Sequence, residues 1–138
     1  MQTLFQLGLE DARRIATAAR AKAQAEGWTV VIAIVDDGGH LILLERADGT
    51  QKASVQVAQE KARTAILYKR PTKALEDAVG AGRLVLMQLP GATPIEGGLP
   101  LVTADGHYVG AIGVSGVLSA QDGQVAAAGV AALAAEVS

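Results

Sequence analysis

The segment WTVVIAIVDDGGHLILLER, residues 28–46, constrains the fold more than any other part of this chain. Its first half, residues 28–36, is rich in β-branched residues and almost continuously apolar, which is typical of a strand buried on both faces. A second apolar stretch, residues 40–46, follows Asp-Gly-Gly, whose glycines can adopt positive φ in a tight turn. The segment therefore predicts an antiparallel hairpin in a sheet that other elements cover on both sides.

The rest of the chain supplies helices and a second hairpin. Apolar residues recur at helical spacing in residues 9–26, and Gly27 is suited to end that helix. A second Asp-Gly turn joins two further strands, and the pair Ser119 and Asp122 resembles the capping box that begins a helix. In order, the expected elements are a helix at 9–26, strands at 28–36 and 40–46, helices at 52–69 and 72–86, a loop rich in Pro and Gly at 89–100, strands at 101–105 and 107–116, and a helix at 120–136. This order predicts one domain over residues 1–138, an α/β/α sandwich around one central antiparallel sheet.

Composition argues against several functions. The 138 residues carry a net charge of −2 without a basic run, and aromatic residues make up 3% of them. Nucleic-acid binding needs clustered Lys and Arg or stacking rings, so it is not expected. The absence of cysteine excludes disulfides, thiolate metal sites and cysteine nucleophiles. No apolar run is long enough for a membrane span and the N-terminus does not resemble a signal peptide, so we expect a cytoplasmic protein with a small-molecule ligand.

The two histidines both follow a glycine in a predicted turn. His40 closes DDGGH, and His107 lies in ADGHYVG. An imidazole at such a position can bind haem iron or transfer a proton, although a histidine that contacts only the turn or solvent is the more frequent case. A metal site shared by both would need the two turns side by side, together with carboxylates such as Asp36, Asp37 or Asp105. The spacing alone does not require that arrangement.

Lys61 is the residue that the helical pattern explains least. In a helix at 52–69 most polar side chains share one arc, and Lys61 lies outside it among mainly apolar neighbours. Either its side chain extends along apolar surface to reach water, or it is partly desolvated. In the second case Lys61 would bind an anion or act as a general base, with Tyr68 or Thr64 as its hydrogen-bonding partner. Glu96, in the loop rich in Pro and Gly, or His40 would then move a proton.

Five segments together resemble the GlcG/HbpS family, which also includes the C-terminal domain of PduO-type proteins. They follow one another over nearly the whole chain and read VVIAIVDDGGHLILLERADGT, AQEKARTAILYKRPT, GGLPL, GHYVGAIGVSG and SAQDGQVAAAG. The resemblance implies a profilin-like α/β/α fold, assembly into a homo-oligomer and, for some members, binding or degradation of haem. His40 lies in the first segment, which makes it the candidate axial ligand of a haem iron. Lys61 and Tyr68, in the second segment, are further candidate cofactor-binding residues.

The sequence leaves three functions open. The first is binding of haem or a related tetrapyrrole, such as a corrinoid, with His40 on the metal. The second is an enzyme without a cofactor that acts on a small anionic metabolite of a catabolic pathway, with Lys61 and Glu96 as catalytic residues. The third is an oligomeric interaction module without chemistry, a use that profilin-like folds often serve.

Overall fold

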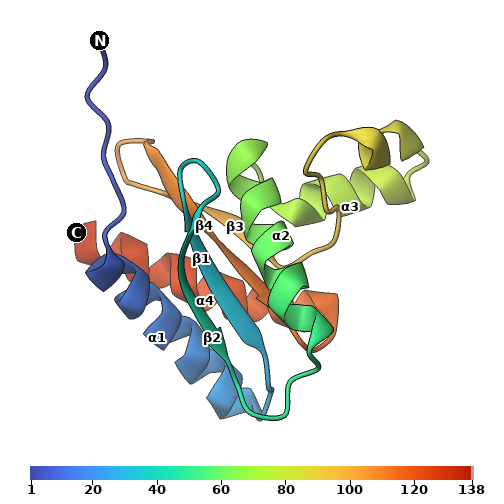
Figure 1. Ribbon diagram of the computed structural model, residues 1–138, viewed down its shortest axis with the longest axis horizontal. Helices are drawn as coiled ribbons and strands as arrows, with labels where there is room; N and C mark the ends of the chain where they lie inside the picture. Colours follow the sequence, from blue (N-terminus) through green and yellow to red (C-terminus); the bar gives the residue numbers. More distant parts are fainter. Residues whose placement is uncertain (138) are drawn as a thin grey trace.

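The computed structural model describes residues 1–137, of which the last two are described by their backbone alone. The chain forms α1 (Leu9–Glu26), β1 (Val31–Asp36), β2 (Leu41–Arg46), α2 (Ala53–Leu67), α3 (Thr72–Gly80), the 3-10 helix η1 (Leu84–Gln88), β3 (Gly98–Val102), β4 (Tyr108–Ser115) and α4 (Ser119–Val137) (Figure 1). None of the described helices has the length and hydropathy that crossing a bilayer requires.

The four strands form one antiparallel sheet, as the sequence predicts, and the structure places them in the order β2-β1-β4-β3. β1 pairs with β2 through the first hairpin and with β4 in an unbroken register that places Val31 opposite Ser115 and Asp36 opposite Gly110. β3 pairs with β4 through the second hairpin. Because β1 and β4 are antiparallel, the turns of both hairpins lie at the same end of the sheet (Figure 1).

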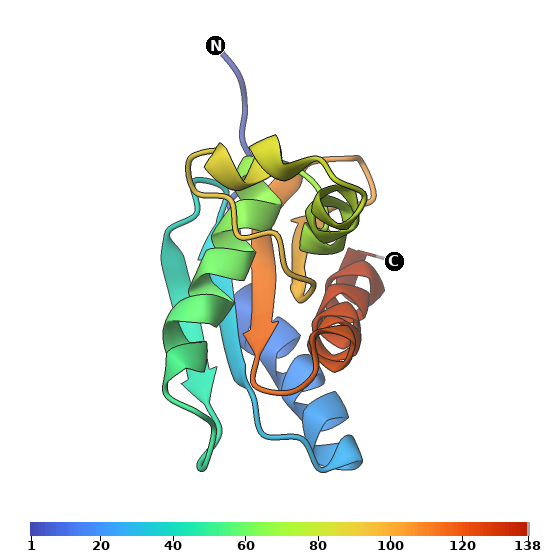
Figure 2. The ribbon, with the colours of Figure 1, turned by 90° about the vertical axis from the view of Figure 1, so that its right-hand side faces the viewer.

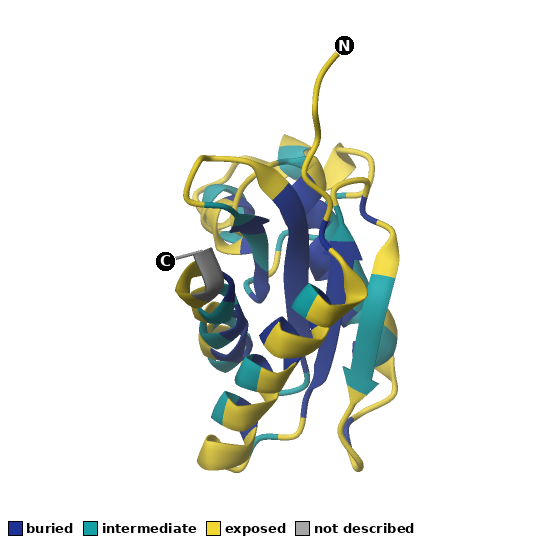
Figure 3. Cartoon of the chain, turned by 90° about the vertical axis from the view of Figure 1, so that its left-hand side faces the viewer, coloured by how far each residue is buried: buried dark blue, intermediate teal, exposed yellow. Residues whose placement is uncertain are grey.

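Helices cover both faces of the sheet, which confirms the predicted sandwich (Figure 2). Side chains of β1 alternate between the two faces. Val31, Ala33 and Val35 pack with α2, whereas Ile32 and Ile34 belong to the core formed with α1 and α4. The central strands β1 and β4 are therefore buried almost throughout, while the edge strand β2 is partly exposed (Figure 3).

Glycines bring the backbone of α2 very close to the sheet. A Cβ atom at Gly113 of β4 would lie 2.0 Å from the carbonyl oxygen of Ala58, and one at Gly98 of β3 would lie 2.3 Å from that of Lys61. Neither distance is possible for a real side chain, so only glycine permits this packing. The close approach fixes where the α2 side chains enter the space between the layers.

The prediction of a helix at 72–86 is wrong at the C-terminal end of that helix. α3 ends at Gly80, and residues 84–88 form the separate 3-10 helix η1. Gly82 has φ +104, which an α-helix does not accommodate. The helix therefore ends before Gly82.

The strand predicted at 101–105 begins three residues earlier, because β3 spans Gly98–Val102. Pro100 lies within it, although proline lacks the N–H that a strand interior donates. β3 is an edge strand, where one side of the backbone has no ladder partner, so proline is tolerated there. The remaining predicted boundaries agree with the structure to within three residues.

Candidate functional site

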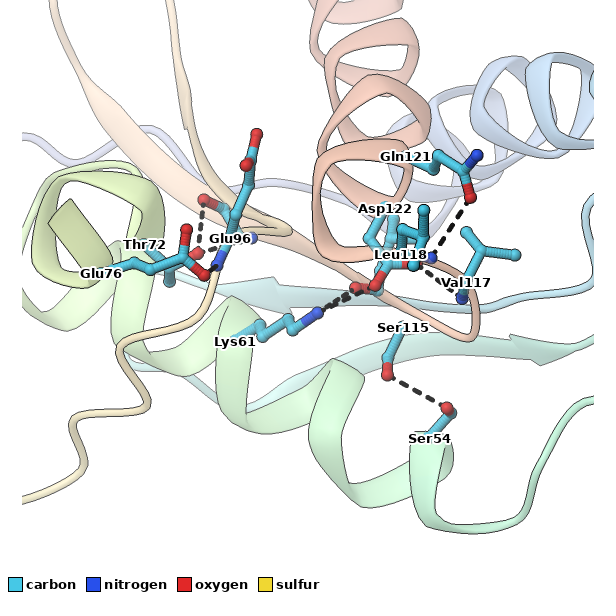
Figure 4. Close-up of polar contacts among 12 residues, drawn as sticks. Ser54, Lys61, Thr72, Glu76, Glu96, Ser115, Val117, Leu118, Gln121 and Asp122 are labelled. Atoms are coloured by element: carbon cyan, nitrogen blue, oxygen red, sulfur yellow. Dashed lines mark hydrogen bonds and ion pairs between the residues drawn. The ribbon is translucent and has the colours of Figure 1, made fainter. Parts of the chain in front are cut away.

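Lys61 is buried between α2, β4 and the start of α4 (Figure 4). Its Nζ donates to the carbonyl oxygen of Val114 at 3.0 Å and to Oδ2 of Asp122 at 3.1 Å. The side chains of Lys61 and Asp122 are each 3% exposed, so the ion pair is almost completely shielded from solvent. Lys61 therefore does not extend along the surface to water, and its partner is Asp122 rather than the predicted Tyr68 or Thr64.

Asp122 is not the capping residue that the sequence suggested. α4 begins at Ser119, and the Asp122 N–H donates to the carbonyl oxygen of Leu118, the residue just before the helix. Its carboxylate instead accepts from Lys61 through Oδ2 and from the Val117 N–H through Oδ1, the latter at 3.1 Å. Burial raises the pKa of Asp122, and the Lys61 ammonium and the Val117 N–H oppose that rise.

Glu96 lies near the same end of α4. A Cβ atom at Gly123 would lie 2.7 Å from its Oε2, which places the carboxylate against the beginning of this helix. Its Oε1 is 3.9 Å from Nζ of Lys73, and among the described residues no hydrogen bond or ion pair joins Glu96 to Lys61. The structure thus gathers Glu96 and Asp122 near a helix N-terminus, where the helix dipole favours carboxylates. It does not place Glu96 in proton-transfer contact with Lys61.

Thr64 and Tyr68 hold the loop after η1 against α2. The Thr64 hydroxyl accepts the N–H of Thr93 at 2.9 Å and lies 2.8 Å from the carbonyl oxygen of Gly91. The Tyr68 hydroxyl donates to the carbonyl oxygen of Pro90. Both hydroxyls are thus engaged with backbone, so a ligand that used the Tyr68 hydroxyl would have to displace Pro90.

The turn that carries His40 has the geometry that its sequence predicts. Oδ1 of Asp36 accepts the N–H groups of Gly38 and His40, both at 2.9 Å, and Gly39 has φ +81. His40 is exposed, and its ring lies over the turn, because a Cβ atom at Gly38 would be 3.1 Å from its Cδ2. Among the side chains of residues 1–135, no group of three or more His, Asp or Glu is arranged to hold a metal ion.

A cavity of about 320 Å³ opens at this end of the sheet, and we call it the hairpin cavity. Its lining residues are Leu4, Phe5, Asp37, Ile66, Lys69, Gly106, His107 and Tyr108. The ring of His107 packs on that of Phe5 with their centroids 4.6 Å apart, and Nζ of Lys69 lies 5.3 Å from the centroid of the Tyr108 ring. An imidazole, two aromatic rings and a cation therefore converge on one space that is open to solvent.

Lys61 and Glu96 do not line the hairpin cavity. Two other cavities, of about 370 and 330 Å³, are also lined by other residues. Lys61 thus has the geometry of a buried ion pair that connects α2 to α4. Its side chain is 3% exposed, so the ammonium is closed off from a substrate in solution.

Comparison with known proteins identifies the family. The family model described as "Haem degrading protein HbpS-like" matches residues 7–131. The chain belongs to this family. The HbpS-like assignment confirms the GlcG/HbpS resemblance seen in the sequence, and a curated relative agrees with it. Protein GlcG of Escherichia coli strain K12 is 46% identical over 115 residues, which cover 83% of this chain and 85% of that protein.

Solved structures of other HbpS-like proteins share the fold. A double mutant of Streptomyces reticuli HbpS superposes with a TM-score of 0.88 at 36% identity, covering 96% of this chain and 90% of that one. A structure of a PduOC:haem complex gives a TM-score of 0.82 at 30% identity, covering 93% of this chain and 95% of that one. The α+β sandwich predicted from the sequence is therefore the fold of the family.

Sequence reasoning missed two features of this HbpS-like chain. It did not pair Lys61 with Asp122, although Lys61 lies outside the polar arc of its helix and Asp122 is the one charged residue among residues 119–135. It also named His40, and not His107, as the candidate ligand of a haem iron. The ring contact of His107 with Phe5 depends on how the N-terminal segment passes this end of the sheet, and no local pattern reveals that.

Proposed function

We propose that this protein binds haem or a related tetrapyrrole in the hairpin cavity. The observation that carries the proposal is the convergence of the His107 imidazole with the rings of Phe5 and Tyr108 on one open space. An imidazole is a common axial ligand of haem iron, and ligand cavities are lined mainly by apolar and aromatic side chains. Phe5 is 55% exposed and Tyr108 is 37% exposed, so this apolar surface is left uncovered in the free chain.

The relatives support the same ligand class. The family description names haem degradation, and one structural relative was solved as a complex with haem. When bound, haem would supply an iron centre on a flat apolar ring. The residues of this chain fit that group, because a histidine borders the cavity and four apolar or aromatic side chains, Leu4, Phe5, Ile66 and Tyr108, line it. They would hold the ring and ligate its iron.

His107 is the axial ligand that the geometry favours, and His40 on the neighbouring hairpin is the one that the sequence favours. A Soret titration of the wild type with His107→Ala and His40→Ala variants separates the two. We expect a saturable Soret shift in the wild type, its loss in His107→Ala and its retention in His40→Ala. A loss confined to His40→Ala would assign the iron to His40. No specific shift in the wild type would refute haem binding.

Lysine-based catalysis is the alternative that the geometry supports less. Lys61 is enclosed with Asp122, and among the described residues Glu96 neither forms an ion pair with Lys61 nor lines the hairpin cavity. We expect substitution of Lys61 to change the free energy of unfolding and to leave haem affinity unaltered. A Lys61 variant that folds normally and loses a measurable turnover of an anionic metabolite would reverse this preference.

We also infer that the chain assembles with copies of itself. Three apolar side chains of η1 support this inference, since Leu84, Val85 and Met87 are 63%, 63% and 57% exposed. Apolar patches of this kind on a small protein commonly mark contacts between proteins. Sedimentation velocity of the wild type is the direct test, and a monomer at micromolar concentration would contradict the inference.

A further inference from the structure

Lys69 follows α2 in a backbone conformation that lysine rarely adopts. Its φ is +51, and among residues 1–137 it is the one residue other than glycine with a positive φ. The eight other positions with positive φ are all glycines. In this left-handed region a side chain crowds its own backbone, so glycine is strongly favoured. The lysine therefore calls for an explanation.

The end of α1 shows that glycine would serve equally well at this place. At the ends of both helices the left-handed residue donates its N–H to the carbonyl three residues earlier, and the next residue donates to the carbonyl five residues earlier. The donors are Gly27 and Trp28 after α1, and Lys69 and Arg70 after α2. Helix termination thus explains the conformation of Lys69 but not its identity. The reason for a lysine lies in its side chain.

The side chain of Lys69 borders the hairpin cavity. Its Nζ lies 5.3 Å from the centroid of the Tyr108 ring, and among the described residues no carboxylate forms an ion pair with it. Asp37 also lines the cavity but is not paired with Lys69. An exposed cation above an aromatic ring contributes only weakly to stability. The ammonium is therefore available to a ligand.

We propose that Lys69 binds the anionic group of the ligand in the hairpin cavity. The apolar body of the ligand lies against Phe5 and Tyr108, and its carboxylate reaches the ammonium. If the ligand is a tetrapyrrole, the anionic group is a propionate. This choice of ligand rests on the proposed function. The same role of Lys69 applies to any flat apolar molecule with one acidic group. The ammonium would make the cavity selective for amphipathic anions over neutral molecules of the same shape.

Haem and its dimethyl ester test this role, because they differ only in the charge of the propionates. We expect Lys69→Gly to weaken haem binding about twofold to fivefold at low ionic strength, the range for a solvent-exposed ion pair. Lys69→Arg should retain the wild-type affinity, and the ester should bind both variants and the wild type equally. The difference in haem affinity between the wild type and Lys69→Gly should become smaller as salt is added. Lys52→Met, which removes an exposed lysine outside the cavity, is the matched control and should change neither affinity.

Two outcomes of this experiment would overturn the proposal. One is an unchanged haem affinity in Lys69→Gly. The other is an equal loss of haem and ester affinity, which would show that Lys69 only shapes the cavity. Folding does not confuse the result, because glycine suits this backbone conformation and the urea midpoint of Lys69→Gly should not fall by a measurable amount.

A second pair of probes separates this inference from haem binding itself. Anilinonaphthalene sulfonate is a flat apolar anion, and N-phenyl-1-naphthylamine is nearly the same molecule without its charge. We expect the anion to bind more weakly to Lys69→Gly than to the wild type and the neutral probe to bind both equally. If the wild type bound no haem but discriminated in this way, the proposed function would fail and the role of Lys69 would stand. Equal binding of the anion to both proteins would refute that role.

Discussion

Breaking the buried ion pair between Lys61 and Asp122 should cost more stability than any surface ion pair of this chain. The two charges are 3.1 Å apart, and both side chains are 3% exposed. With an effective dielectric constant of about 20, two unit charges at that distance attract by about 5 kcal/mol. Removing one partner leaves the other buried without its countercharge, which typically costs about 3–5 kcal/mol. That is a large part of the total stability of a domain of this size.

A double-mutant cycle measures this interaction. We expect Lys61→Met and Asp122→Asn each to lower the free energy of unfolding by about 3–5 kcal/mol in urea titrations at pH 7. The double variant should recover most of that loss, because no unpaired charge remains and the asparagine oxygen can still accept the Val117 N–H. Lys22→Met breaks an exposed pair with Glu26 and should cost at most about 0.5 kcal/mol.

The cost of Lys61→Met should also depend on pH. Burial raises the pKa of Asp122 in the folded protein, and the Lys61 ammonium opposes that rise, so removing it raises the pKa further. When the pKa of a carboxyl is higher in the folded protein than in the unfolded protein, the folded state holds the proton more tightly. The contribution of this carboxyl to the free energy of unfolding is then fully present below the unfolded pKa, and it is lost as the pH rises through the folded pKa. The difference in free energy of unfolding between the wild type and Lys61→Met should therefore become smaller as the pH is lowered from 8 to 5. Two results would refute this reasoning. One is a double variant whose loss of free energy of unfolding equals the sum of the two single losses. The other is a difference between the wild type and Lys61→Met that grows on acidification.

Two further predictions concern packing. Gly113→Ala should lower the free energy of unfolding by about 3 kcal/mol or more, because its Cβ would overlap the carbonyl oxygen of Ala58; thermal unfolding measures this. Gly80→Ala, where a Cβ meets no atom within 4 Å, is its control and should stabilise by up to about 1 kcal/mol. Equal effects of the two would contradict the close packing of α2. Leu84→Glu should shift the sedimentation coefficient toward that of a monomer without changing far-UV circular dichroism, whereas an unaltered coefficient would exclude η1 from the interface.

The sequence by itself determined the layers of this protein and the positions of its turns. Buried strands and helices have local periods, and the Asp-Gly-Gly turn depends on residues that are adjacent in the chain. For that reason residues 31–36 and 41–46 form the predicted hairpin and residues 9–26 the predicted helix. The family segments likewise identified the HbpS-like fold, because they are contiguous stretches of sequence.

Only the tertiary structure decided which side chains meet. Lys61 and Asp122 are 61 residues apart in the chain, and their contact depends on α2 and α4 approaching from opposite faces of the sheet around its edge. Local patterns describe one element at a time, so they assigned Asp122 to a helix cap and left Lys61 either extended to water or bonded to a nearby hydroxyl. The same reason applies to His107 and Lys69, which border one cavity because antiparallel pairing brings two hairpin turns and the end of α2 to one end of the sheet.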